Sequence, residues 1–154
     1  MNLDEKIISA LKDLDYEEAT EIQKKAIPIA LKRRDILAAA QSGTGKTAAF
    51  LLPILAELLE TKQTKTILRT LILVPTRELA SQISKAVEDF SKYMDISSLA
   101  MVGGVSKKEQ EKKIAKGIDI LVATSGRLME HIKNKTVDLS SVTTVVIDEV
   151  DTLL

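Results

Sequence analysis

Apolar residues follow two different periods along the chain, and each period predicts a type of secondary structure. In some segments apolar side chains recur every three or four positions, as on the buried face of an amphipathic helix. These segments are residues 2–14, 20–31, 48–59 and 76–90. Other short runs are mostly apolar, which is typical of buried strands, and they cover residues 35–40, 69–74, 98–102, 118–123 and 144–147. Strands alternating with helices predict an α/β fold with a parallel sheet covered by helices.

Capping residues and helix breakers predict where several elements begin and end. Thr20 with Gln23, and Ser106 with Glu109, have the spacing of a capping box, in which two side chains satisfy N–H groups of the first helical turn. Pro28 lies inside the second predicted helix and is expected to kink it. Further predicted boundaries are a cap at Thr76, a helix opened by residues 124–127 and a surface loop at residues 60–66.

Length and composition restrict the class of protein. The chain has 154 residues, about one domain, with 22 Lys+Arg against 22 Asp+Glu, so a nucleic-acid or membrane partner would need a local patch. There are no cysteines, which excludes disulfides and thiolate zinc sites. No run approaches the ~18 apolar residues of a membrane span, so we expect a soluble, cytoplasmic protein. An aromatic content of 3% disfavours a base-stacking platform.

A glycine-rich segment, residues 40–48, lies between the apolar run 35–40 and the helical pattern 48–59. Gly43 and Gly45 allow a loop whose N–H groups point at a polyphosphate, and the helix that starts near Lys46 adds its positive dipole end. Lys46 can reach the β- and γ-phosphates and the Thr47 hydroxyl can ligate magnesium. The candidate nucleotide-binding residues here are Gln41, Ser42, Gly43, Thr44, Gly45, Lys46, Thr47 and Ala48. The alternative is a flexible Gly/Ser turn before an amphipathic helix.

An acidic cluster follows the last apolar run. Asp148 is a candidate magnesium ligand, because magnesium takes few carboxylates and keeps several waters; Thr47 and Glu149 are the other candidate ligands. Glu149 could orient and deprotonate an attacking water, and Lys46, Asp148 and Glu149 form the candidate catalytic set. An acidic surface turn is the alternative. Ligands bind at the carboxyl ends of parallel strands, and the polar clusters at 43–47, 75–78, 103–104, 124–127 and 148–151 each follow a predicted strand.

The order of these motifs resembles the first RecA-like domain of the DEAD-box RNA helicases. Residues 40–47 resemble motif I of that family, residues 75–80 match motif Ia, and residues 148–151 resemble motif II. Between them, Gly103-Gly104 matches the GG pair and residues 124–127 resemble motif Ib. Tyr16, Ala19, Thr20, Ile22 and Gln23 resemble the Q motif. The resemblance spans residues 16–151, nearly the whole chain.

The resemblance implies an activity, cofactors and partners. It implies an RNA-dependent ATPase that hydrolyses ATP with Mg²⁺ and unwinds or remodels RNA. Gln23 would read adenine, with Tyr16 and Thr20 beside it in the Q motif. The implied contacts to the RNA sugar–phosphate backbone are Pro75, Thr76, Arg77, Gly103, Gly104, Thr124, Gly126 and Arg127. Hydroxyls, N–H groups and arginines bind phosphates without base preference, although Arg77 could instead pair with an acid such as Glu78, and Gln23 could be only a helix cap.

The chain departs from the family pattern at single positions and at its end. The single departures are Asp15, Ala19, Ala40, Ser125 and Val150. The family places a further strand after motif II, between the phosphate-loop strand and the motif II strand, and then a second domain. We therefore expect a partial RecA-like domain over residues 1–154, nearly inactive alone. An open gap in its sheet predicts marginal stability or repair by a strand-exchanged dimer, because unpaired buried backbone groups cost about 1–3 kcal/mol each.

Two alternative functions and two other features remain open. The chain could be a truncated, non-catalytic RNA- or nucleotide-binding module; a phosphate-loop kinase is less well matched because acceptor-binding elements are missing. A basic run at residues 107–116 could contact RNA, but interleaved Glu109 and Glu111 favour a solvated helix face. His131, the only histidine, is interpreted as structural.

Overall fold

The computed structural model describes residues 3–61 and 65–153. The chain divides into two compact units, which are described separately. The helical unit comprises residues 1–62 and 86–95, and the sheet unit comprises residues 63–85 and 96–154. Helix α4 (Arg77–Phe90) begins in the sheet unit and ends in the helical unit.

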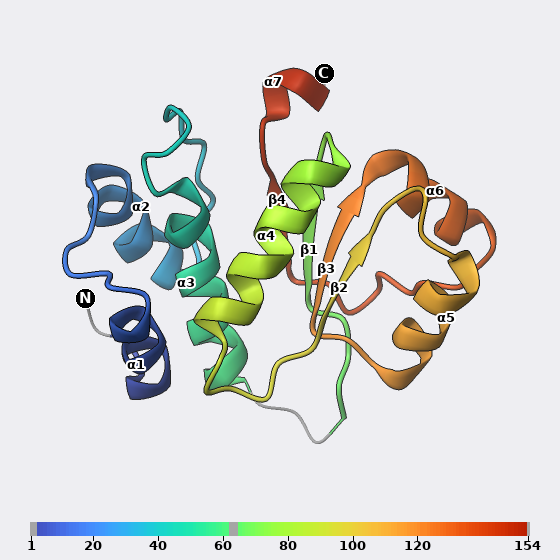
Figure 1. Ribbon diagram of the computed structural model, residues 1–154, viewed down its shortest axis with the longest axis horizontal. Helices are drawn as coiled ribbons and strands as arrows, with labels where there is room; N and C mark the ends of the chain where they lie inside the picture. The colour runs from blue at the N-terminus through green and yellow to red at the C-terminus, as the bar shows by residue number, and fades with distance from the viewer. Residues whose placement is uncertain (1–2, 62–64, 154) are drawn as a thin grey trace. The chain divides into compact units, whose positions relative to one another are not determined.

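The helical unit is built around α3 (Lys46–Glu60), with α1 (Glu5–Asp13) and α2 (Glu21–Leu31) packed against it (Figure 1). The side chains of Leu51, Leu52 and Leu55 on α3 are almost completely buried. The Asp4 carboxylate caps α1 by accepting a hydrogen bond from the N–H of Lys6 at 2.8 Å. These helices fall where the apolar periodicity predicts them, because each can bury one apolar face against its neighbours.

The last turn of α4 and the residues after it hold α1 within the same unit. The Asp13 carboxylate accepts hydrogen bonds from the Tyr93 hydroxyl and from the Lys92 ammonium, the latter at 3.0 Å. These two donors hold the pKa of Asp13 below its usual value. Nearby, the rings of Tyr16 and Phe90 meet edge to face with centroids 5.6 Å apart.

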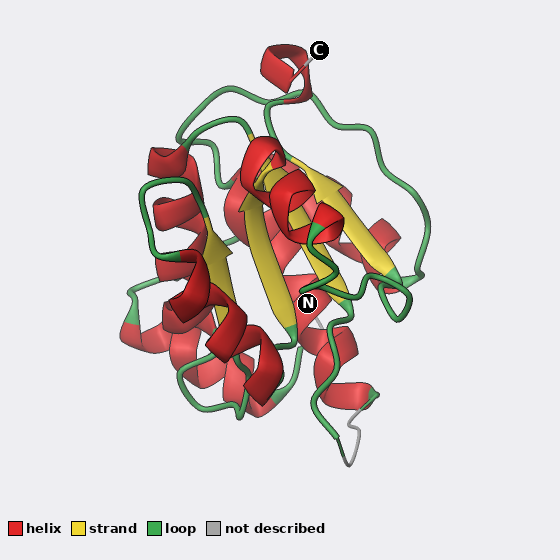
Figure 2. Ribbon diagram, turned by 90° about the vertical axis from the view of Figure 1, so that its right-hand side faces the viewer, coloured by secondary structure: helices red, strands yellow, loops and turns green. Residues whose placement is uncertain are grey.

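The sheet unit contains a four-stranded parallel sheet in the order β2-β3-β1-β4 (Figure 2). Its strands are β1 (Thr70–Val74), β2 (Ser98–Met101), β3 (Ile120–Thr124) and β4 (Thr144–Ile147). At the centre, Ile72 on β1 pairs with Val122 on one side and Val146 on the other. Side chains of Ile72, Ile120, Leu121 and Val122 are fully buried, as expected for strands covered on both faces. The predicted α/β fold with a parallel sheet is confirmed.

Three further helices complete this unit. They are α5 (Lys107–Lys116), α6 (Ser125–Lys133) and the short α7 (Val150–Leu153). Helix α5 lies against β2, and α6 lies against β3 (Figure 1). The apolar core on this side includes Leu71, Leu99, Met101 and Leu121. Each helix starts just after a strand or a loop that follows one, so its N-terminus lies at the carboxyl edge of the sheet.

The strand predicted at residues 35–40 is wrong. In the structure this segment has no regular secondary structure, and the exposed fractions of Ile36 and Leu37 are 42% and 94%. A strand is stable only where neighbours accept its N–H and C=O groups, and among the described residues the sheet holds the other four predicted strands alone.

Strand β4 lies at one end of the strand order of the sheet. It pairs with β1 but has no strand on its outer side within the described part of the chain. Its side chains alternate in burial, and Val145 and Ile147 are about half exposed, at 56% and 50%. The open edge that the family resemblance predicted beside the motif II strand is therefore present.

Two smaller predictions concern helix ends. The Thr76 cap is confirmed, because its hydroxyl oxygen accepts a hydrogen bond from the N–H of Leu79 at 3.2 Å. Ser106 precedes α5 but its side chain makes no capping hydrogen bond, so the second capping box is wrong. Residues 62–64 of the loop predicted at 60–66 lie outside the described residues. No helix in residues 3–61 or 65–153 has the length and apolarity needed to cross a membrane.

Candidate functional site

The phosphate loop in the helical unit has the backbone that its glycines predict. Gly43 and Gly45 have φ of +80° and +89°, the left-handed region that other residues enter at a cost. Gly45 is the N-cap of α3, whose first residues are Lys46 and Thr47. The loop therefore delivers Lys46 and Thr47 at the positive end of a fifteen-residue helix. This arrangement is suited to binding a polyphosphate.

Gln23 connects the predicted Q motif to this loop. Its amide oxygen accepts a hydrogen bond from the Thr20 N–H at 3.0 Å, and its amide nitrogen donates to the Gly45 carbonyl at 3.2 Å. Gln23 is 3% exposed, so both bonds are shielded from water. Gln23 is thus the helix cap that the capping-box pattern predicted, and its second function is to hold the phosphate loop through Gly45.

The close approach at Gly45 also explains why a glycine stands there. A Cβ atom at this position would lie 2.5 Å from the Gln23 amide nitrogen and 2.8 Å from the Thr20 hydroxyl oxygen. At Gly43, by contrast, a Cβ would have no neighbour within 4 Å. The two glycines therefore share a backbone conformation but differ in packing.

Tyr16, the aromatic residue of the Q motif, is partly exposed. Its ring edge packs on Phe90, and 45% of the residue is accessible to solvent. Tyr16 also lies one residue after Asp15, which has a positive φ of 58°. The aromatic ring is therefore held at the surface of the helical unit by a fixed contact on one side.

In the sheet unit, polar residues gather at the carboxyl edge because all four strands run in the same direction. β1 ends before Pro75 and Thr76, and β2 ends before the loop that contains Gly103 and Gly104. β3 ends at Thr124, directly before Gly126 and Arg127 in the first turn of α6, and β4 ends before Asp148. Four of the predicted polar clusters therefore share one edge of one sheet. The fifth, the phosphate loop, follows a segment that is not a strand.

The two candidate RNA-binding arginines both bond to the glycine loop after β2. Arg77 donates through Nη1 to the Gly103 carbonyl at 3.2 Å, and Arg127 donates through Nη1 to the Val105 carbonyl at 3.3 Å. Arg127 also lies 3.4 Å from a carboxylate oxygen of Glu130, which Lys107 contacts at 3.1 Å. Arg77 thus contacts the glycine loop. This contact differs from the pairing with an acid such as Glu78 that was the alternative from the sequence.

Asp148 is positioned by backbone hydrogen bonds on both sides of its Cα atom. Its N–H donates to the Leu73 carbonyl at 3.0 Å, and its carboxylate accepts from the N–H of Glu149 at 2.9 Å. Glu149 has a φ of +52°, an unusual conformation for a residue with a side chain. Local backbone strain of this kind is found at functional sites, and here it marks the turn that directs the acidic cluster away from β4.

The donor set fits magnesium bound through few protein ligands. Within the described residues, no group of three or more His, Cys, Asp or Glu side chains could hold a metal by itself. Magnesium characteristically takes one or two carboxylates and completes its shell with phosphate oxygens and water. The Asp148 carboxylate in the sheet unit and the Thr47 hydroxyl in the helical unit are each ligand types that magnesium accepts.

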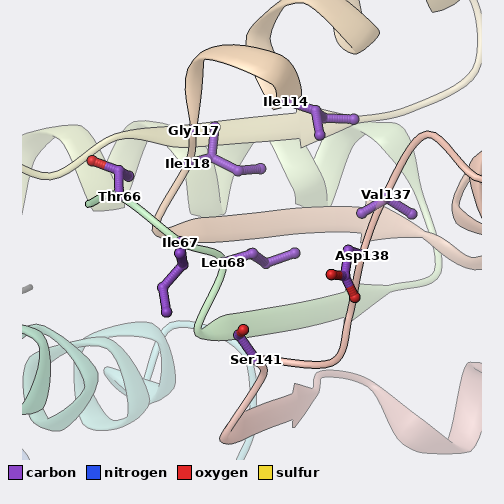
Figure 3. Close-up of a pocket in the computed structure, with 9 residues that line it drawn as sticks. All are labelled: Thr66, Ile67, Leu68, Ile114, Gly117, Ile118, Val137, Asp138 and Ser141. Carbon is purple, nitrogen blue, oxygen red and sulfur yellow. The ribbon is translucent and has the colours of Figure 1, made fainter.

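A cavity in the sheet unit lies away from these residues. It has a volume of about 160 Å³ and a mostly apolar lining (Figure 3). Its lining residues are Thr66, Ile67, Leu68, Ile114, Gly117, Ile118, Val137, Asp138 and Ser141. Most of these precede β1, β3 or β4, so the cavity lies at the amino edge of the sheet, opposite the candidate site.

Two buried polar residues of this unit form a pair that the sequence did not predict, although the burial of His131 agrees with its interpretation as structural. Gln110 and His131 are 1% and 0% exposed, and each hydrogen-bonds to the other. A detectable signal existed, since Gln110 lies four residues before Ile114 and His131 lies three residues after Leu128. Each polar residue therefore shares a helix face with an apolar one, and buried polar side chains require partners.

Comparison with known proteins identifies the family. The family model for DEAD/DEAH box helicases matches residues 20–154. The chain is 43% identical over 155 residues to the probable ATP-dependent RNA helicase ddx27 of Dictyostelium discoideum, covering 100% of this chain and 20% of that protein. It is 42% identical over 155 residues to the ATP-dependent RNA helicase SrmB of Escherichia coli, covering 100% of this chain and 35% of that protein.

A solved structure has the same fold. A crystal structure of a hypothetical ATP-dependent RNA helicase from Sulfolobus tokodaii matches with a TM-score of 0.87 and 37% identity, over 99% of this chain and 43% of that one. The phosphate loop and the parallel sheet define a nucleotide-binding domain of the RecA-like type. The chain belongs to the DEAD/DEAH box helicase family. It spans only about a fifth to a third of the length of the two curated relatives named above.

Proposed function

We propose that the chain is the ATP-binding part of an ATP-dependent RNA helicase that hydrolyses ATP and remodels or unwinds RNA. The observation that carries the proposal is the phosphate loop, in which two glycines with left-handed φ lead into α3 at Lys46-Thr47. The Gln23 amide holds this loop by donating a hydrogen bond to the Gly45 carbonyl. A flexible turn before an ordinary helix has no need of a buried amide bonded to its last glycine.

Each residue of the candidate nucleotide site has a role in this proposal. Lys46 neutralises the β- and γ-phosphates, and the N–H groups of the loop bind the same phosphates. The candidate Mg²⁺ ligands are Thr47 of the helical unit and Asp148 and Glu149 of the sheet unit, and the ion would neutralise charge on the phosphates. Glu149 orients the attacking water and accepts its proton. Only the resemblance to the Q motif assigns Gln23, Tyr16 and Thr20 to adenine, because in the structure the buried Gln23 amide bonds to Thr20 and Gly45.

RNA binds at the carboxyl edge of the sheet unit through its sugar–phosphate backbone. The candidate contacts are Pro75, Thr76, Arg77, Gly103, Gly104, Thr124, Gly126 and Arg127. Hydroxyls, backbone N–H groups and guanidinium groups bind phosphate oxygens and carry no base preference. This part of the proposal is supported by the parallel sheet, which collects all these residues at one edge.

We also propose that this chain alone turns over little ATP. Phosphoryl transfer enzymes of this type depend on an arginine that stabilises the transition state, which can be worth ~10³-fold or more. The curated relatives named above are about three to five times the length of this chain, and the proposal assigns that arginine to the part of them that this chain does not span.

A strand-exchanged or edge-to-edge dimer of this chain is part of the proposal. Strand β4 is the last strand of the sheet in the described part of the chain and carries two half-exposed aliphatic side chains, Val145 and Ile147; such edge strands associate with other chains. Light scattering across a concentration series should detect a dimer that Val145→Lys weakens. A monomer at every concentration would contradict this part without affecting the nucleotide site.

Nucleotide binding provides the test of the proposed function. We expect calorimetry to detect ATP binding in the presence of Mg²⁺, and Lys46→Ala to weaken it by at least about tenfold, since a charge-assisted contact to phosphate is worth ~1.5–3 kcal/mol. Lys24→Ala, on the exposed side of α2, is the matched control and should leave the affinity unchanged. Equal affinities for the Lys46→Ala variant and the wild type would contradict the assignment. RNA binding that persists without any nucleotide binding would favour a non-catalytic RNA-binding module.

A further inference from the structure

The glycine loop after β2, residues 102–105, is held by three side chains from three helices. Gln110 on α5 donates through Nε2 to the Val102 carbonyl at 3.0 Å. Arg77 on α4 and Arg127 on α6 donate to the carbonyls of Gly103 and Val105, at 3.2 and 3.3 Å. Three of the four carbonyls of this loop therefore accept a hydrogen bond from a side chain, and these bonds restrict its conformation.

The three donors differ in burial. Arg77 is exposed, whereas the Arg127 side chain is 12% exposed and also pairs with Glu130. A guanidinium has five N–H donors, so these partners leave other N–H groups of each arginine for a phosphate. Gln110 is 1% exposed. A buried carbonyl that loses its hydrogen-bond donor costs folding free energy, whereas an exposed carbonyl can form a hydrogen bond to water instead. Gln110 is therefore the donor on which the loop conformation depends most.

His131 determines the orientation of the Gln110 amide. Its Nε2 lies 2.9 Å from the Gln110 Oε1, and its Nδ1 lies 2.7 Å from the Thr136 hydroxyl. Since the Gln110 amide nitrogen donates to Val102, the amide oxygen faces the imidazole and Nε2 must carry the proton. Burial lowers the pKa of His131, which favours the neutral ring with this single tautomer. In this tautomer Nδ1 accepts the single proton of the Thr136 hydroxyl, whose oxygen also lies 3.1 Å from the His131 carbonyl oxygen. The bonds form a continuous chain from Thr136 through His131 and Gln110 to Val102.

We infer that Gln110 and His131 are positioning residues for RNA binding. They hold loop 102–105 in the conformation in which Arg77 and Arg127 bracket it, and so set the spacing of the two guanidinium groups that meet successive phosphates. Neither side chain contacts RNA, because both are buried. The inference depends on the proposed function, in which this edge of the sheet binds the RNA backbone.

The first test is the salt dependence of RNA binding. Gln110→Met removes both amide bonds at similar volume and without a change in charge, and we expect it to weaken binding of a single-stranded RNA by roughly fivefold to tenfold. Misplacing one arginine removes about one phosphate contact, so the slope of log K against log salt should fall by ~0.7. Gln82→Met, at an exposed position of α4, is the matched control and should alter neither quantity.

A loss of stability alone would not change the salt slope of the folded protein, so the slope separates positioning from a purely structural role. An unchanged affinity and slope for Gln110→Met would overturn the inference while leaving the proposed function intact. Failure of the wild type to bind RNA at low salt would overturn both.

The second test needs no substitution and covers the case in which Gln110→Met fails to fold. His131 is the only histidine, so ¹⁵N spectra of the imidazole need no assignment. At pH 7.5 we expect the Nε2–H tautomer, and we expect added RNA to shift the Nε2 signal although the ring is 0% exposed. An Nδ1–H tautomer, or a signal that saturating RNA leaves unmoved, would overturn the inference.

Discussion

Two segments of this chain, residues 35–40 and strand β1, are both mainly apolar but have different structures. Each contains a run of aliphatic residues and is followed by a loop with a candidate function. β1 has a hydrogen-bonded neighbour on each side and its Ile72 is completely buried, whereas Leu37 in the other segment is 94% exposed. The difference shows that an apolar run becomes a strand only where partners are available for its backbone.

The two candidate binding loops differ in how they are held. The phosphate loop obtains its conformation mainly from two glycines with positive φ, with Gln23 bonded to the second one. The loop at 102–105 is held by side chains on three carbonyls. Conformation is thus encoded locally in the first loop and by tertiary contacts in the second. We therefore expect the first loop to be sensitive to substitution of its own residues and the second to substitution of residues distant in sequence.

The largest effect is expected from truncating the two apolar segments at equivalent places. Ile72→Ala removes a fully buried side chain from the centre of the sheet and should lower the free energy of unfolding by about 2–5 kcal/mol. Leu37→Ala should change it by less than ~0.5 kcal/mol, because the side chain is already in water. Urea denaturation of both variants measures the difference. A large loss for Leu37→Ala would mean that residues 35–40 are buried in solution.

An intermediate effect is expected within the phosphate loop. An alanine at either glycine has an unfavourable positive φ, which costs about 1–2 kcal/mol. Gly45→Ala additionally places a Cβ against the Gln23 amide and the Thr20 hydroxyl, so its cost should be larger than that of Gly43→Ala. Denaturation midpoints and ATP affinity of the two variants test this ranking. Equal losses would show that packing against Gln23 contributes nothing to the loop.

The smallest effect is expected from pH, and it tests the tertiary network of the sheet unit. Burial lowers the pKa of His131 from 6.5, while the nearby charges of Glu111 and Glu130 raise it and those of Arg127 and Lys107 lower it. The unfolded chain therefore binds more protons below pH 6.5 than the folded chain does. The stabilisation from neutral His131 is present above pH 6.5 and is lost as pH falls through the lower folded value, by at most ~1.4 kcal/mol per pH unit.

Unfolding free energies at pH 7.5 and 5.5 measure this contribution. His131→Gln removes the titrating group, so the difference between the two pH values should be smaller in this variant than in the wild type. The same pH dependence in both proteins would show that other groups account for it.

Most of the fold could be predicted from the sequence because its signals are local. Strand β4 has the predicted bounds, residues 144–147, and helices α3, α4 and α6 begin within two residues of the predicted positions. Gly43, Gly45 and Lys46 identified the phosphate loop, because few other residue combinations allow such a loop to open a helix. The Thr76 cap could also be predicted, because a threonine hydroxyl just before a helix commonly accepts a hydrogen bond from an N–H group of its first turn.

The sequence by itself determined the alternation of strands and helices, the phosphate loop and the motif order, because periodicity, glycine and capping act over a few residues. Only the tertiary structure decided three other features: that residues 35–40 stay outside the sheet, that Gln23 bonds to Gly45, and that Gln110 and His131 hold the glycine loop. In these features the hydrogen bonds of Gln23, Gln110 and His131 join partners about eight or more residues apart in sequence. Residues 35–40 lack a neighbouring strand among the described strands. Hydrogen bonds between such distant groups form only after the chain has packed, so no local pattern specifies them.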